Sequence, residues 1–492
     1  MIQTMIEPVA TLRTTLGHLE PAPSSSATVP PTLSQIYAPE GHEAAIDPER
    51  PVVVGGRGTG KSFWSATLLD TTTRHFVAGS YPRLQLDQCD VSLGFAGVDS
   101  DHHGAPSREE LDDLINTDGH PPEKVWRAVV LRSVAAHIDA KIPSRLRGAD
   151  GLVAWVSADA ARTQSLLRQA DQTLQTKNKR VIVLFDALDR LGQDWRQIRE
   201  RTRALLQVTL AMRTYHAIKP KIFLRVDQAD DTGIGAFPDA SKLLSPGSRV
   251  DLNWDARDLY GLLYTLLVND AQASPVFSDL VREACGIVLP RENQQILNSA
   301  LKGDSGTQAK VFSEMAGEFM GASKTKGRTY TWLPKHLADA HERVSPRTFL
   351  EAIRQAAQHR DATPSRRALS PSGLRAGIRG ASKLRLQQLK EEYGWIEEVI
   401  SPLADQQVPC GEIELFARWN EAQTIGAIAH SNGRFLEPIE MSETDNPQPT
   451  TILKALLRIG VAERRANGRI NIPDIYRVAA KMLRKGGVPP ER

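Results

Sequence analysis

A glycine-rich loop followed by lysine and serine is the strongest chemical signal in the sequence. It runs from Gly55 to Ser62 after the apolar residues 52–54, and it fits the pattern G-x-x-x-x-G-K-[ST] of a phosphate-binding loop. Its glycines let the backbone wrap an anion, and a helix starting at its end adds a positive dipole end. Lys61 would reach the β- and γ-phosphates, and the Ser62 hydroxyl would bind Mg²⁺. The segment predicts a nucleoside triphosphate site. The residues expected to bind the nucleotide here are Gly55, Gly56, Arg57, Gly58, Thr59, Gly60, Lys61, Ser62 and Phe63.

An acid at the end of an apolar run is the expected metal ligand. Residues 180–185 are mostly apolar and lead into Asp186. A carboxylate at the end of a buried strand next to the loop would hold Mg²⁺ opposite Ser62. The alternative is that Asp186 caps a helix.

Asp189 is the candidate for activating the attacking water. It would reach the γ-phosphate if the chain turns after the strand that ends at Asp186; otherwise it is a surface or capping acid. Lys61, Asp186 and Asp189 are therefore the predicted catalytic residues. The neighbouring Arg190 either points at another subunit or pairs with Asp189.

Two further segments offer residues that could sense the γ-phosphate. The apolar run 221–226 contains Arg225 and is followed by Asp227, and the end of a parallel strand beside the metal-binding strand would face the phosphates. Ser345-Pro346-Arg347 begins a predicted helix, because proline suits a first helical turn. Arg347 would contact the nucleotide from a helical lid, or it is simply an exposed arginine.

Two other clusters of residues give weaker evidence for a functional site. His102 and His103, with Asp99 and Asp101, are either a metal site or a solvated loop. Near the end of the chain an Asn-Gly turn predicts a hairpin over 461–472. Its candidate nucleic-acid contacts are Arg464, Arg465 and Arg469, followed by Arg477, Lys481, Arg484 and Lys485. Such a hairpin would bind phosphates, dock a protein or be a soluble edge.

Alternating apolar runs and amphipathic stretches predict the elements that position these residues. The pattern from 45 to 253 is typical of a parallel sheet flanked by helices. We expect strands at 52–54, 75–78, 181–185, 221–226 and 249–252, and helices at 123–138, 158–174 and 195–216. Helices are also expected at 256–267, capped by Asp255, and at 346–357.

Changes in composition predict five segments. They are a flexible N-terminal lead-in (1–44), a nucleotide-binding domain (45–253), a helical lid (254–358), a basic linker (359–383) and a winged-helix-like α+β domain (384–492). The last would contain a helix at 450–459, the hairpin and a helix at 473–483.

Bulk composition excludes several classes. A net charge of +3 gives no global attraction to nucleic acid, so any basic surface must be local. Three cysteines without a C-x-x-C pair argue against a disulfide framework and a cysteine-rich zinc site. No stretch approaches a membrane span and no signal peptide is recognisable, so we expect a cytoplasmic protein.

The segment from 52 to about 350 resembles P-loop ATPases of the AAA+/STAND group. The resemblance rests on the phosphate loop, on Val-Leu-Phe-Asp-Ala-Leu-Asp-Arg (183–190) and on Ser-Pro-Arg (345–347). The second motif is similar to that of STAND and KAP ATPases, and the order of the parts resembles origin-recognition-type ATPases. The resemblance implies a nucleotide-dependent switch that assembles or remodels partners, a build often found in bacterial antiphage defence. Ala187 stands where many AAA+ proteins have a glutamate, which argues against fast hydrolysis.

The expected function is therefore a slow Mg²⁺-dependent ATPase that couples ATP binding and hydrolysis to assembly. Its partner would be a second copy, another protein or, through the C-terminal domain, nucleic acid. One alternative is a pseudo-ATPase scaffold that binds nucleotide without turnover. The other is a P-loop kinase with a small acceptor, which fits less well because about half of the chain lies beyond the nucleotide fold.

Overall fold

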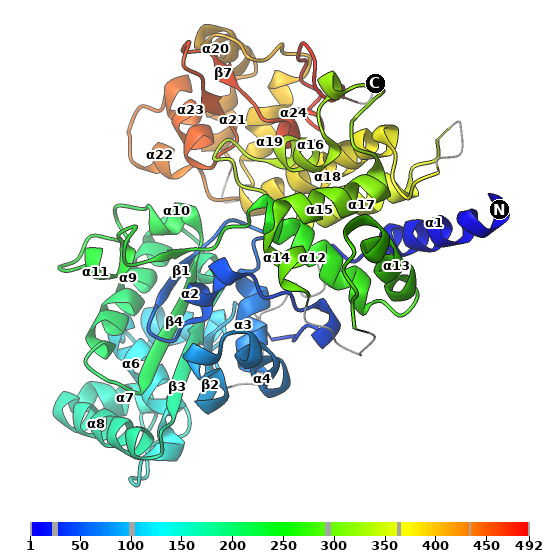
Figure 1. Ribbon diagram of the computed structural model, residues 1–492. Helices are drawn as coiled ribbons and strands as arrows, with labels where there is room; N and C mark the ends of the chain where they lie inside the picture. The colour runs from blue at the N-terminus through cyan, green and yellow to red at the C-terminus, as the bar shows by residue number, and fades with distance from the viewer. Residues whose placement is uncertain are drawn as a thin grey trace.

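The strands between residues 52 and 251 form a parallel sheet. The computed structural model describes residues 2–21, 28–97, 104–290, 297–361, 366–431 and 434–490. Five strands pair in the order β2-β3-β4-β1-β5, all parallel (Figure 1). They are Val52–Val54 (β1), Cys89–Phe95 (β2), Arg180–Phe185 (β3), Ile218–Leu224 (β4) and Val250–Asp251 (β5). The expected α/β class is confirmed.

Helices cover both faces of this sheet because successive strand residues point to opposite sides. Val52 and Val54 join one apolar core, whereas Val53 joins the other. The helices on the first side are Pro122–Ser133 (α6), Leu152–Ala158 (α7), Ala160–Thr176 (α8) and Trp195–Met212 (α9). Those on the second side are Glu43–Ile46 (α2), Lys61–Leu69 (α3) and Thr71–Ser80 (α4).

One strand expected from the sequence is a helix. Residues 75–78 lie inside α4, which begins after Asp70 because the Asp70 carboxylate accepts a hydrogen bond from the Thr73 backbone N–H (2.8 Å). The fifth strand is instead β2, which pairs only with β3 and therefore forms an edge of the sheet. The two-histidine cluster expected to be a metal site or a loop lies outside the described residues.

The N-terminal segment is packed rather than a free lead-in. Ile2–Gly17 forms α1, which lies against the helices around 273–285 and 346–358 (Figure 1). Leu12 and Leu16 are buried there because their i, i+4 spacing puts them on one helical face, and Leu19, just after the helix, is buried as well. Beyond 28 the chain continues to the buried Tyr37 and His42. The description of residues 1–44 as a flexible lead-in is wrong for this packed part.

In the described part of the chain, six helices follow the sheet and form the region that we call the lid. They are Ala256–Asn269 (α12), Ala273–Cys285 (α13), Ser299–Gly303 (α14), Ser305–Ala316 (α15), Thr329–Leu337 (α16) and Pro346–Gln358 (α17). Asp255 caps α12 as expected, accepting a hydrogen bond from the Asp258 N–H (2.9 Å). Ser345 caps α17 in the same way through the Thr348 N–H (3.2 Å).

A long helix replaces most of the expected basic linker. Pro371–Glu392 forms α18, which Ser370 caps at the Gly373 N–H (2.9 Å). The helix lies directly against α17, because a Cβ at Gly373 or Gly377 would overlap carbonyl oxygens of α17. Gly373 and Gly377 therefore permit close packing of the two helices.

The C-terminal part is mainly helical with one hairpin. Its elements are Ile396–Ile400 (α19), Glu412–Glu421 (α20), Thr424–Ala429 (α21), Ile439–Ser442 (α22), Pro449–Arg458 (α23), Glu463–Arg464 (β6), Ile470–Asn471 (β7) and Asp474–Arg477 (α24). The hairpin is confirmed, since β6 pairs with β7 around Gly468, whose φ is 77°. The helix expected at 473–483 is short, ending at Arg477. The winged-helix assignment and the domain boundaries stay predictions. Among the described helices, none has the length and apolar character that crossing a bilayer requires.

Candidate functional site

The loop between β1 and α3 has the shape of an anion cradle. Gly58 and Gly60 have φ angles of 78° and 103°, a left-handed backbone that favours glycine and folds the loop over the start of α3. The Lys61 ammonium donates to the carbonyl oxygens of Gly55 (2.7 Å) and Gly56 (2.9 Å), so its charge lies within the loop. Burial lowers the pKa of Lys61, while the negative charge of Asp186 opposes that change.

Asp186 lies beside Ser62 at the end of β3. Its side chain is buried, with 2% of the residue exposed, and one oxygen is hydrogen-bonded with the Ser62 hydroxyl. Burial raises the pKa of Asp186, against the effects of Ser62 and Lys61. The other oxygen, Oδ2, has no hydrogen-bond partner among the described residues. A carboxylate oxygen without a partner beside a hydroxyl is a donor set that fits Mg²⁺.

The chain turns sharply after Asp186. Ala187 has a φ of 57°, unusual for a residue with a side chain, and a short helical turn follows over 188–190. This turn brings Asp189 to the cavity, where its Oδ2 lies 3.5 Å from the Arg225 guanidinium. Arg190 instead donates to the Gly97 carbonyl (3.2 Å). Of the two sequence-based alternatives for Arg190, pairing with Asp189 is therefore not the arrangement found.

Arg225 follows β4, and β4 lies between the strands that carry the loop and Asp186. Its guanidinium contacts Asp227 (2.9 Å) and Glu392 (3.2 Å), and it lies 4.6 Å from the Tyr393 ring centre. Burial disfavours the charge of Arg225, but Asp227, Tyr393 and Glu392 outweigh burial and raise its pKa. Of the two sensor candidates, Arg225 lines the cavity and Asp227 holds it in place. Glu392 carried no signal in the sequence.

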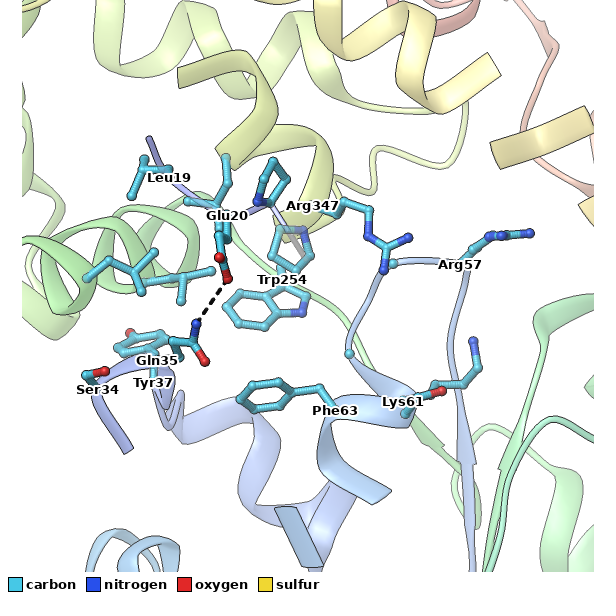
Figure 2. Close-up of a pocket in the computed structure, with 18 of the residues that line it drawn as sticks. Leu19, Glu20, Ser34, Gln35, Tyr37, Arg57, Lys61, Phe63, Trp254 and Arg347 are labelled. Atoms are coloured by element: carbon cyan, nitrogen blue, oxygen red, sulfur yellow. Dashed lines mark hydrogen bonds between the residues drawn. The ribbon is translucent and has the colours of Figure 1, made fainter. Parts of the chain in front are cut away.

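Arg347 reaches the same cavity from the first turn of α17. Pro346 and Arg347 line it opposite the phosphate loop, and a Cβ at Gly58 would lie 3.5 Å from that of Arg347. Figure 2 shows the Arg347 guanidinium near the loop that carries Arg57 and Lys61. Burial, and then the charge of Arg57, lower the pKa of Arg347. An anion bound between these groups would favour its charged form.

The cavity has a volume of about 870 Å³ and extends from the phosphate loop to a mainly aromatic end. Phe63, Trp254 and Tyr37 lie there around the opening shown in Figure 2. Glu20 and Gln35 come from the N-terminal segment, and the Gln35 amide donates to the Glu20 carboxylate (3.5 Å). Aromatic rings beside polar groups suit a base and a sugar. Sequence reasoning missed this contribution, although the leucine spacing of α1 signalled a packed helix.

A buried histidine supports the floor of the site. Trp64 donates to Nδ1 of His42 (3.1 Å), and Nε2 of His42 donates to the Asn253 carbonyl (2.9 Å). Trp254, whose ring packs edge-on against His42, donates to the Thr59 carbonyl of the phosphate loop (2.8 Å). Burial lowers the pKa of His42 to about 4, so the ring is neutral at pH 7.

This histidine should make the fold sensitive to acid. The folded pKa of about 4 lies below the ordinary 6.5, so the stability that His42 contributes is complete above pH 6.5 and is lost as the pH falls toward 4. Between pH 6.5 and pH 4, the free energy of unfolding of the wild type should fall by about 3 kcal/mol more than that of His42→Gln, because glutamine cannot be protonated. Chemical denaturation of both proteins at several pH values measures this. Parallel pH profiles would contradict it.

The C-terminal arginines lie elsewhere and are partly paired. None of Arg464, Arg465 and Arg469 lines the cavity; Arg464 pairs with Glu412, and Arg465 lies 3.7 Å from Glu463. Arg477, one of the basic residues expected to contact phosphates, is buried and pairs with Asp474 (2.8 Å). It supports the domain interior. Nucleic-acid binding by the hairpin stays a prediction.

No protein-family model matches this chain, and no curated protein matches its sequence. Two solved structures are similar in fold. The Aeropyrum pernix ORC1 protein in complex with DNA is 11% identical, with a TM-score of 0.34, over 92% of this chain and 94% of that one. The Aeropyrum pernix ORC2 protein, solved as ADPNP–ADP complexes, is 14% identical, with a TM-score of 0.30, over 90% and 93%. The chemistry proposed below rests on the site itself.

Proposed function

We propose that this protein is a Mg²⁺-dependent ATPase that works as a slow switch. The observation that carries the proposal is the shared cavity. The phosphate loop, Asp186, Arg225 and Arg347 all line it, and Oδ2 of Asp186 has no hydrogen-bond partner among the described residues. These groups are an anion cradle, a ligand for a divalent cation and two positive charges. They match the parts of a nucleoside triphosphate, and the aromatic end leaves room for its base.

Each side chain has a role in hydrolysis. The loop N–H groups and Lys61 bind the β- and γ-phosphates, and Ser62 and Asp186 hold Mg²⁺. Mg²⁺ held by Ser62 and Asp186 would neutralise developing charge on the phosphate oxygens. Arg225 and Arg347 stabilise the same charge from the sheet and from the lid. Asp189 orients the attacking water and accepts its proton.

The geometry favours slow turnover. Position 187 is an alanine, so the carboxylate available for the water is Asp189, which already lies 3.5 Å from Arg225. Hydrolysis then requires Asp189 to turn from Arg225 toward the water. This suits a device that stays in its ATP state long enough for a partner to respond.

The output of the switch is assembly with a partner through the lid and the C-terminal part. The lid approaches the nucleotide with Arg347, and the C-terminal part contacts the nucleotide-binding part directly. Trp195 of α9 donates to the Glu437 carbonyl (2.9 Å), and Arg199 pairs with Glu443 (3.0 Å). A change at the cavity can therefore reach a distant surface. We include a second copy, another protein and nucleic acid as partners.

Phosphate release tests the enzymatic part of the proposal. Asp189→Asn should lower steady-state release by about 100-fold, the lower range for loss of a general base, with unchanged affinity for an ATP analogue. Asp239→Asn is a matched control, because Asp239 pairs with Lys242 on the surface and asparagine tolerates its left-handed backbone. Equal rates for the wild type and Asp189→Asn would contradict the assignment. Binding without any release would identify the pseudo-ATPase alternative, and labelled phosphate on a small acceptor would identify a kinase.

A further inference from the structure

Two successive acids at the end of α18 bind two of the arginines at the phosphate end of the cavity, Arg225 and Arg57. We call Glu391 and Glu392 the acidic pair. Glu392 Oε1 lies 3.2 Å from Nε of Arg225, and Glu391 Oε2 lies 2.6 Å from Nη2 of Arg57 in the phosphate loop. The Gln388 carbonyl also accepts a hydrogen bond from Arg57 (3.4 Å). One helix end thus holds both the loop and the γ-phosphate sensor.

The Glu392 contact is the more buried of the two. The Glu392 side chain is 7% exposed and that of Arg225 is 12% exposed, whereas Glu391 and Arg57 are 49% and 34% exposed. Glu392 lines the cavity, and its charge acts on Lys61 as well as on Arg225. Water screens charges less at buried sites, so the Glu392–Arg225 pair interacts more strongly.

A carboxylate at this place conflicts with the γ-phosphate of ATP. Both groups are anionic, both are attracted to Arg225 and Lys61, and they repel each other across a partly water-excluded cavity. ADP has no γ-phosphate and leaves the pair undisturbed. We propose that the γ-phosphate and Glu392 compete for Arg225, so that ATP, but not ADP, releases the acidic pair. This inference rests on the proposed function.

Release of the acidic pair would move more than one side chain. Ser382 of α18 accepts a hydrogen bond from the Ala479 N–H (2.9 Å), so the helix is joined to the C-terminal part. The ring of Tyr393, which follows Glu392 in the chain, covers the Arg225 guanidinium. Displacing Glu392 therefore loosens the junction between the nucleotide site and the C-terminal part, which gives the switch a physical route from γ-phosphate to partner surface.

Comparing ATP with ADP in Glu392→Gln tests this competition. Glutamine keeps the shape of the side chain but removes its charge. The ratio of the Kd for ADP to the Kd for a non-hydrolysable ATP analogue should rise by about fivefold or more, within the usual range of coupling between sites. Glu391→Gln should shift the ratio in the same direction by less. Glu398→Gln is the control, because Glu398 pairs with an arginine of the C-terminal part (Arg434, 3.0 Å) and should shift nothing.

Hydrogen exchange of the full chain provides the readout of release. In the wild type, the ATP analogue should increase exchange at 388–395 relative to ADP. In Glu392→Gln, exchange there should already be high without nucleotide. An unchanged Kd ratio with an unchanged exchange pattern would overturn the inference while leaving an ATPase in place. Loss of turnover with an unchanged ratio would also overturn it and assign Glu392 to catalysis. If the wild type bound neither nucleotide, the proposed function itself would fail.

Discussion

Replacing Lys61 by alanine is expected to reduce ATP binding below detection and to leave the fold intact. The Lys61 ammonium already lies inside the loop, 2.7 Å and 2.9 Å from two loop carbonyls. A charge-assisted hydrogen bond contributes about 1.5–3 kcal/mol, so loss of two phosphate contacts lowers affinity on the order of 100-fold to 10,000-fold. Calorimetric titration with a non-hydrolysable ATP analogue measures the affinity, and circular dichroism checks the fold.

The control for this experiment is Lys324→Ala. Lys324 lies in an exposed turn at 324–326, so its removal changes the net charge equally without reaching the cavity. Native mass measurement with ADP and with the ATP analogue should show a nucleotide-dependent change of assembly in the wild type and in this control, but not in Lys61→Ala. If Lys61→Ala bound the analogue as tightly as the wild type, the loop would not be the phosphate site.

The second large effect is expected from Asp186→Asn. In this variant, adding Mg²⁺ to ATP should no longer stabilise the protein beyond what ATP does alone. Asp186 is buried and one of its oxygens lacks a hydrogen-bond partner among the described residues, so a bound cation would satisfy it. An asparagine carries no charge and binds Mg²⁺ far more weakly. Thermal unfolding in the presence of ATP, with and without Mg²⁺, measures how much Mg²⁺ raises the unfolding temperature. Ordinary turnover and an undiminished Mg²⁺ effect in Asp186→Asn would refute the metal assignment.

The pH dependence of this effect has a definite sign. Burial raises the folded pKa of Asp186, so without metal its ionisation destabilises the fold as the pH rises through that value. Asp186→Asn lacks this cost, and at pH 7 without metal it should be at least as stable as the wild type. Mg²⁺ binds the ionised carboxylate. The stabilisation of the wild type by Mg²⁺ should therefore shrink as the pH falls through the raised pKa of Asp186.

Sequence patterns predicted the centre of the fold well because they are local. The apolar run of β1 ends at two glycines and that of β3 ends at Asp186, and such bounded runs identify buried parallel strands without further information. The edge strand β2 was missed because its alternating residues, 89–95, make a weaker signal than a continuous apolar run. The short apolar run at 75–78 was misread as a strand, since the Asp70 cap that starts α4 is a subtler signal than hydrophobicity.

Contacts between distant segments could not be predicted from the sequence. The loop, Asp186, Asp189, Arg225 and Arg347 were all expected near the nucleotide, and in the structure they line one cavity. Glu392 and the segment around Glu20 were not expected. Their residue types are ordinary, and only the packing of α18 and α1 brings them to the cavity.

The close packing of α17 on α18 also determines how the protein can respond. Glycines at 373 and 377 leave no side-chain layer between the two helices, so sliding or rolling one past the other would collide with backbone atoms. We therefore expect the two helices to move as one rigid body, which carries Arg347 at one place and the acidic pair at another. If a nucleotide drew Arg347 inward and displaced Glu392, it would turn that body about the phosphate end of the cavity. The attraction at Arg347 and the repulsion at Glu392 would then act as a torque on the two helices, instead of moving the two side chains independently.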